Sequence, residues 1–78
     1  MIIYHDCLTF KILGKDIYLY SEKMDYGYNT VAEIDGKTHY LGNEFGNITT
    51  AIFAWEDLNG RLLTKEELRQ VLLDNKII

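Results

Sequence analysis

The sequence is poor in the features that mark secreted or membrane-bound proteins. Its one cysteine, Cys7, has no second cysteine for an internal disulfide, which indicates a reducing compartment or indifference to redox conditions. No stretch approaches the ~20 consecutive apolar residues that a transmembrane helix requires. The N-terminus also lacks the basic segment of a signal peptide. We therefore expect a complete, cytoplasmic chain without membrane contact.

Basic residues are scarce in the middle of the chain. Between residues 16 and 57 there are eight carboxylates, but the only bases are Lys23 and Lys37. Excess negative charge repels the phosphates of nucleic acids and attracts basic protein surfaces. The charge pattern therefore predicts a partner protein with a basic surface and argues against nucleic-acid binding.

The sequence also lacks a motif that identifies a reaction. His5, Cys7 and His39 come closest to a metal or nucleophile site. A structural zinc site needs four ligands, however, and a cysteine nucleophile needs a base that nothing here assigns. The alternative to a metal-binding or catalytic role is that Cys7 is a small buried residue of a strand. We expect a protein that is not an enzyme and that has no catalytic residues, metal or cofactor.

Apolar and polar residues alternate in the first half of the chain with the period of β-strands. Residues 7–21 predict a β-hairpin. Gly14-Lys15 is its expected turn, because glycine suits the first central position of a type II′ turn. This register places Ile12 opposite Ile17.

A second hairpin is predicted around Asp35-Gly36, a strong turn signal. Its register has two alternatives. A two-residue turn pairs Val31 with Tyr40, whereas a three-residue turn pairs Ala32 with Tyr40. The sequence pattern is compatible with both.

The segments outside the two hairpins carry weaker signals. Residues 22–29 are polar and contain a glycine, so they predict a loop between the hairpins. Residues 1–4 predict either a short strand of their own or the start of a longer one.

Helical spacing replaces the β-pattern in the second half of the chain. The first helix is predicted over residues 47–59, with Asn47 as its N-cap. The second is predicted over residues 64–75, where Thr64 and Glu67 have the spacing of a capping box. Leu68, Val71 and Leu72 are expected to face inward from it.

The order of these elements predicts an α+β fold in a single domain, residues 1–78. Residues 1–45 are expected to form an antiparallel sheet of three to five strands, built from two hairpins. The two C-terminal helices are expected to pack on one face of this sheet.

The six tyrosines are the strongest functional signal. Tyrosine offers a large amphipathic contact area at low entropy cost and is enriched at binding hot spots. Tyr18 and Tyr20 share the polar face of a predicted strand, and Tyr26 and Tyr28 flank a glycine. Phe53 lies off the apolar stripe of the first helix. The predicted partner-binding residues are Tyr18, Tyr20, Glu22, Asp25, Tyr26, Tyr28 and Phe53.

These features predict a small, acidic, non-enzymatic protein-interaction module. In size, acidity, and lack of proline and of a catalytic set, the chain resembles in character the small accessory proteins of phages and mobile elements, which often inhibit a host or defence protein. The expected function is inhibition or modulation of a larger basic, nucleic-acid-processing protein by steric occlusion.

Two alternatives remain open. The first is a structural or accessory subunit that assembles into a homo-oligomer. The second is a helix-turn-helix-like DNA-binding regulator. Glu66 and Glu67 argue against the latter, because they lie at the N-terminus of the second helix, where a recognition helix meets DNA.

Overall fold

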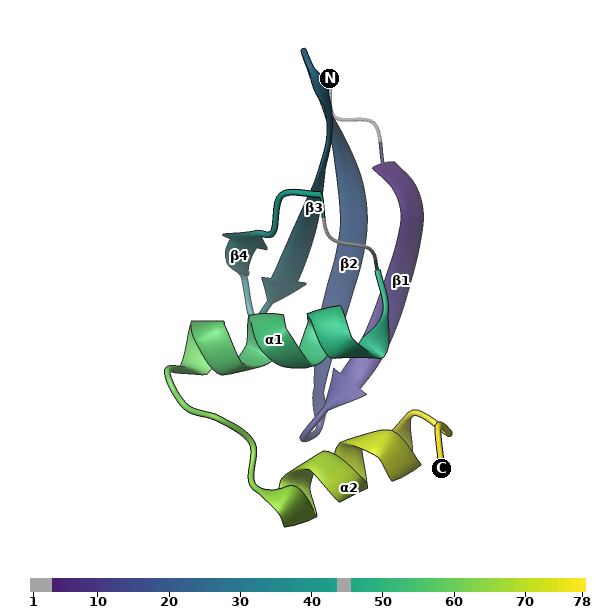
Figure 1. Ribbon diagram of the computed structural model, residues 1–78, viewed down its shortest axis with the longest axis vertical. Coiled ribbons are helices and arrows are strands. Elements are labelled where there is room, and N and C mark those ends of the chain that lie inside the picture. Colours follow the sequence, from purple (N-terminus) through teal and green to yellow (C-terminus); the bar gives the residue numbers. More distant parts are fainter. Residues whose placement is uncertain (1–3, 44–45) are drawn as a thin grey trace.

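The computed structural model describes residues 4–43 and 46–78, with the backbone alone for residues 4–6. It has the predicted α+β architecture, a four-stranded antiparallel sheet followed by two helices (Figure 1). The strands lie in the order β1-β2-β3-β4. The elements are β1 (Tyr4–Ile12), β2 (Lys15–Met24), β3 (Gly27–Ile34), β4 (Lys37–Tyr40), α1 (Ile48–Asn59) and α2 (Lys65–Asp74). Of the predicted strand at residues 1–4, residues 1–3 lie outside the described residues.

The register of the first hairpin differs from the prediction. Leu13 and Gly14 form the turn, and Ile12 pairs with Lys15 while Phe10 pairs with Ile17. Both turn residues have positive φ, 48° for Leu13 and 81° for Gly14. Such a turn matches the right-handed twist of the flanking strands. A shift by two residues keeps every side chain on the same face, so the predicted apolar face survives the error.

The second hairpin takes the two-residue alternative. Val31 pairs with Tyr40. The turn residues Asp35 and Gly36 have φ values of 49° and 77°. An Asp-Gly turn adopts two successive positive φ values at low energetic cost. This turn fixes the register in which Val31 pairs with Tyr40.

The predicted loop at residues 22–29 is wrong. β2 continues to Met24 and β3 starts at Gly27, so only Asp25 and Tyr26 form the turn. Figure 1 shows the resulting hairpin reaching well beyond the helices. The ladder between β2 and β3 pairs the backbone of these polar residues, which lets them form strand without burying apolar side chains.

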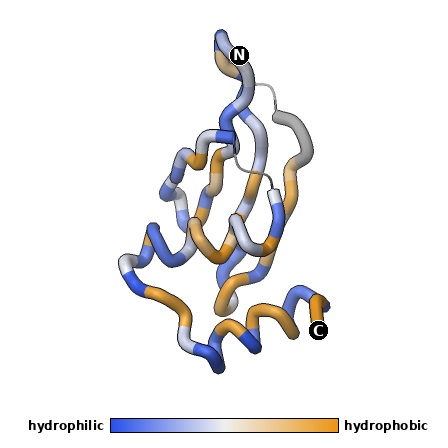
Figure 2. The backbone as a smooth tube through the Cα atoms, viewed as in Figure 1, coloured by the Kyte–Doolittle hydropathy of each residue, from blue (hydrophilic) through white to orange (hydrophobic). Residues whose placement is uncertain are grey.

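The core lies between one face of the sheet and α1. Ile12, Ile17 and Leu19 are fully or almost fully buried and pack against Ala51 and Trp55 of α1. Figure 2 shows hydrophobic segments where α1 crosses the strands. Helix α1 contacts all four strands, and its helix-period apolar residues supply the other half of the core.

The predicted ends of α1 are confirmed. The side chain of Asn47 accepts the N–H of Thr50 at 2.9 Å, as an N-cap does. Gly60 follows the last turn with a φ of 68°, the left-handed conformation that commonly ends a helix. In the part of the chain that the structure describes, no helix is long and apolar enough to cross a membrane.

The predicted capping box of α2 is also confirmed. The hydroxyl of Thr64 accepts the N–H of Glu67, and the Glu67 carboxylate accepts the N–H of Thr64. Arg61 donates two hydrogen bonds to the same carboxylate, each 2.8 Å long. These Arg61 bonds, and then the Thr64 N–H, lower the pKa of Glu67 from 4.5 to about 2.

Helix α2 lies at the end of the sheet (Figure 1). It contacts β1 and makes no backbone contact with α1, so the described helices do not form an αα-hairpin on the sheet. Val71 is its one fully buried residue, and Leu68, predicted to face inward, is 38% exposed. Because α2 lies at the end of the sheet, only a narrow stripe of it reaches the core (Figure 1).

A candidate protein-interaction surface on the open sheet face

The second face of the sheet, which we call the open face, carries no helix in the part of the chain that the structure describes (Figure 1). Strand alternation places Tyr20, Val31 and Tyr40 side by side across three strands of this face. The next row is Thr9, Tyr18, Glu33 and Thr38. The open face therefore brings together aromatic side chains from β2 and β4.

Val31 is the most informative residue of the open face. It is 0% exposed but does not belong to the core cluster under α1. Cross-strand neighbours stand about 5 Å apart, close enough for large side chains to touch. Tyr20 and Tyr40 are its directly paired neighbours on this face. The two tyrosines thus form a partly apolar centre on an otherwise polar face.

The charges of the open face are mainly negative. Lys11 forms an ion pair with Asp16 at 3.2 Å. Glu22 and Glu33 share this face, and neither has an ion-pair partner among the residues that the structure describes. Two carboxylates beside tyrosine rings suit a partner that presents lysine or arginine.

Asp25, Tyr26 and Tyr28 lie away from the centre of the open face. Asp25 and Tyr26 form the turn at the tip of the long hairpin, and Tyr26 is 89% exposed. Tyr28 is a strand residue rather than a loop residue, and it pairs with Lys23 on the opposite face. Both tyrosines are exposed.

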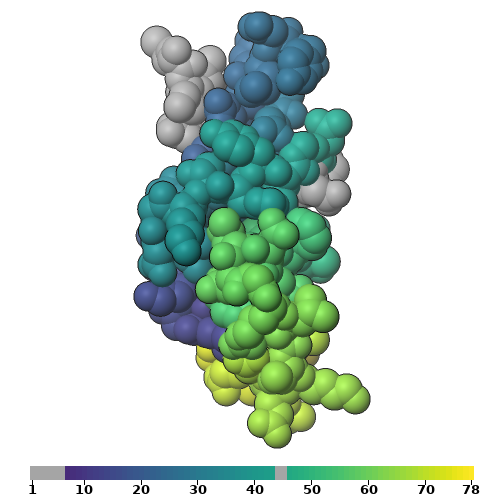
Figure 3. All heavy atoms as spheres, turned by 90° about the vertical axis from the view of Figure 1, so that its left-hand side faces the viewer, coloured from purple at the N-terminus to yellow at the C-terminus, as the bar shows by residue number. Residues whose placement is uncertain are grey.

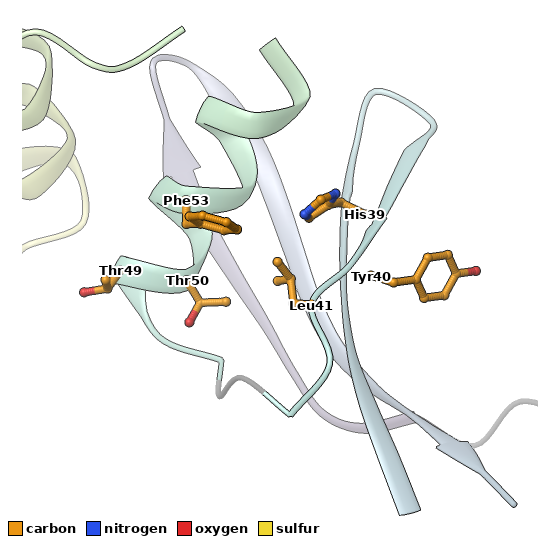
Figure 4. Close-up of a pocket in the computed structure, with 6 residues that line it drawn as sticks. All are labelled: His39, Tyr40, Leu41, Thr49, Thr50 and Phe53. Carbon is orange, nitrogen blue, oxygen red and sulfur yellow. The ribbon is translucent and has the colours of Figure 1, made fainter. Parts of the chain in front are cut away.

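Phe53 lines a groove between α1 and β4. The groove has a volume of about 460 Å³ and is lined by His39, Tyr40, Leu41, Thr49, Thr50 and Phe53. Figure 4 shows His39 and Leu41 directed toward α1, whereas the Tyr40 ring points to the other side. The predicted contact residues thus fall into three places: the open face, the hairpin tip and this groove.

The residues considered for metal or nucleophile chemistry are far apart. Cys7 is exposed rather than buried, on β1, while His39 lies on β4 at the opposite edge of the sheet. The side chain of His5 lies outside the described residues. Within the described residues, no group of three or more His, Cys, Asp or Glu could hold a metal ion.

Glu56 and Asp57 are adjacent in the sequence but contact different residues. The Glu56 carboxylate accepts the N–H of Leu63 at 2.7 Å and so fastens the segment between the helices. An Asp57 oxygen lies 3.2 Å from Nδ1 of His39. The two carboxylates therefore have local structural contacts.

Tyr40 is an aromatic residue of the open face that the sequence did not identify as a contact. It is 60% exposed and pairs with the buried Val31. Its place on this face depends on the register of the second hairpin, which the sequence left open. A preference for two-residue Asp-Gly turns would have located it.

The chain matches no protein-family model, and it has no detectable similarity to a curated protein or a solved structure. What the protein binds therefore has to be inferred from the surface itself.

Proposed function

We propose that this protein is a non-enzymatic interaction module that binds a larger protein with a basic surface through the open face. The observation that carries the proposal is the row formed by Tyr20, Val31 and Tyr40. It places a desolvated aliphatic residue between two tyrosines on a face without helices. Interfaces are built in this way, with aromatic anchors at the centre and a polar rim.

Charge supports the same partner class. Glu22 and Glu33 flank the tyrosines, and Asp25 lies at the end of the same hairpin. Long-range attraction between these carboxylates and a basic surface speeds encounter, whereas the tyrosines supply contact area. If the basic surface is the groove of a nucleic-acid-processing protein, the bound module occludes it, and inhibition follows.

A comparative capture experiment tests the proposal. Immobilised wild-type protein and a Tyr18→Ser/Tyr40→Ser variant are exposed to the same lysate of the native host, and retained proteins are quantified by mass spectrometry. Truncating hot-spot aromatics costs ~2 kcal/mol or more each, so the variant should lose the specific partner almost completely.

The matched control is Leu62→Ser, which removes a highly exposed apolar side chain outside the open face and outside the predicted contact residues. It should retain the partner. Equal retention by the open-face variant and the wild type would refute the proposal. Recovery of nucleic acid in place of a basic protein would also refute it.

A further inference from the structure

Strand β4 is an edge of the sheet, and its outer side offers unused backbone groups. In a two-residue hairpin, the residues flanking the turn exchange hydrogen bonds and the next pair does not. Ile34 and Lys37 flank the turn, so the N–H and C=O of Thr38 and Tyr40 point away from β3. In the described part of the chain, no group is bonded to them.

The opposite edge of the sheet is treated differently. There the side-chain amide of Asn75 accepts the N–H of Lys11 at 2.9 Å and donates to the Lys11 carbonyl at 2.6 Å. This pair of bonds reproduces what a neighbouring strand would supply. Natural sheets cover their edges because unpaired edges recruit other strands. At the β4 edge, the described residues provide no such cover.

The groove lies directly along the β4 edge. Figure 3 faces this edge and shows the teal residues of β4 at the surface beside the green residues of α1. Side chains of a strand added to β4 would point alternately to the two sides of the sheet. One set would enter the groove against Phe53 and Leu41, and the other would lie on the open face beside Tyr40.

The two sides of the sheet favour different side chains in the added strand. Phe53 and Leu41 give the groove an apolar wall. On the open face, Glu33 stands next to Thr38 across the strand pair and has no ion-pair partner in the described residues. A lysine or arginine opposite Thr38 can reach over this short side chain to Glu33, and an arginine can also stack on Tyr40.

A second copy of this chain fits the edge poorly. Pairing β4 with its own copy requires a two-fold axis at or beside His39, near the middle of this short strand. The His39 and Phe53 ring centroids are 6.2 Å apart, so α1 crosses the sheet close to that axis. The two α1 helices would then compete for the same space beneath the joined strands. A single extended segment avoids this collision.

We propose that an extended segment of another protein, with alternating cationic and aliphatic residues, adds to β4 as a fifth strand. Main-chain hydrogen bonds to Thr38 and Tyr40 hold it, while the groove and Glu33 select its side chains. This site shares Tyr40 with the open face, but it does not require that a partner covers that face. Failure of one proposal therefore leaves the other standing.

The probe is the synthetic peptide Ac-Arg-Val-Lys-Val-Arg-Val-Lys-NH2, added to ¹⁵N-labelled protein. Hydrogen exchange of the Thr38 and Tyr40 amides should slow by about tenfold or more at saturation, because strand addition engages those groups. A peptide with glutamate at each cationic position should not bind. Binding that leaves both amides unprotected overturns the proposal, as does equal binding of the acidic peptide.

Variants separate the edge from other surfaces. Thr38→Pro removes an outward N–H and leaves the ladder with β3 intact, so peptide affinity should fall roughly fivefold to tenfold, the equivalent of one hydrogen bond. Phe53→Ser, at an exposed helix position, should also weaken peptide binding. This variant tests the site independently if the proline variant fails to fold. Thr9→Pro, which removes an outward N–H at the β1 edge, is the matched control and should bind normally.

The oligomeric state of the unliganded protein tests whether a second copy of the chain occupies the β4 edge. Sedimentation should show a monomer. A dimer that Thr38→Pro dissociates would mean that a second copy occupies the β4 edge, and it would overturn the assignment to a foreign segment. Unchanged affinity in both Thr38→Pro and Phe53→Ser would overturn the site itself.

Discussion

The two faces of the sheet use the same strands for different purposes. The face under α1 is filled by aliphatic residues such as Ile17 and Leu19, which lose almost all contact with solvent. The open face instead carries tyrosines and carboxylates around Val31, its one buried residue among those that the structure describes. Alternation along a strand therefore separates residues that stabilise the fold from residues available for binding. This division can be tested one face at a time.

The largest effect is expected on the covered face. Leu19→Ala removes a buried side chain and leaves a cavity, which typically costs 2–5 kcal/mol, roughly, in the free energy of unfolding. Tyr18→Ala, one residue away but on the open face, should cost less than about 1 kcal/mol. Urea denaturation of the two variants measures both. Equal losses would contradict the division between the faces.

Val31 is buried although it lies on the open face, so it tests the comparison between the two faces. Because its side chain is buried between cross-strand tyrosines, Val31→Ala should destabilise the protein by roughly 1–3 kcal/mol, within the usual range for buried positions. Thr38→Ala is a suitable control, since Thr38 is an exposed residue of the same face. A loss at Val31 no larger than the loss at Thr38 would mean that the tyrosines do not shield it.

Helix α2 supports the covered side from the end of the sheet through Val71. Thr64→Ala removes its N-cap, so the free energy of unfolding should fall by about 1 kcal/mol. Thr49→Ala, within the first turn of α1 and not a cap, is the matched control. An unchanged denaturation midpoint for Thr64→Ala would show that the capping box does not contribute to stability.

The smallest effect depends on pH. The pKa of Glu67 is lowered from 4.5 to about 2, first by the hydrogen bonds from Arg61. The carboxylate therefore stabilises the folded state above pH 4.5, and this contribution is lost as the pH falls toward 2. Glu67→Gln should melt at a lower temperature than the wild type at pH 6, and the gap should close near pH 2. A gap that is constant with pH would contradict this account.

The fold was largely predictable because its local signals are strong. Asn47 and the Thr64–Glu67 pair marked the starts of the two helices by the hydrogen bonds that their side chains can make. The position of α2 was not predictable. Its capping signal says where the helix starts but not which surface it meets, and Asn75 finds its partner Lys11 far away in the sequence.

The turns and the open face show where sequence patterns lose information. A leucine at positive φ is unusual, so the Leu13-Gly14 turn was not the expected choice. The outer part of the β2–β3 hairpin is polar on both sides, so it has no alternation to distinguish a strand from a loop. Tyr18 and Tyr20 were identified by alternation, whereas Tyr40 needed the unresolved register of the second hairpin.

Amide chemical-shift mapping of the complex tests the central claim most directly. ¹⁵N-labelled protein is titrated with the purified basic protein that the wild type captures, at moderate salt. The open-face assignment predicts the largest shifts at Tyr18, Val31 and Glu33, with the amides of α2 unaffected. Shifts concentrated on α2 with an unperturbed open face would contradict it.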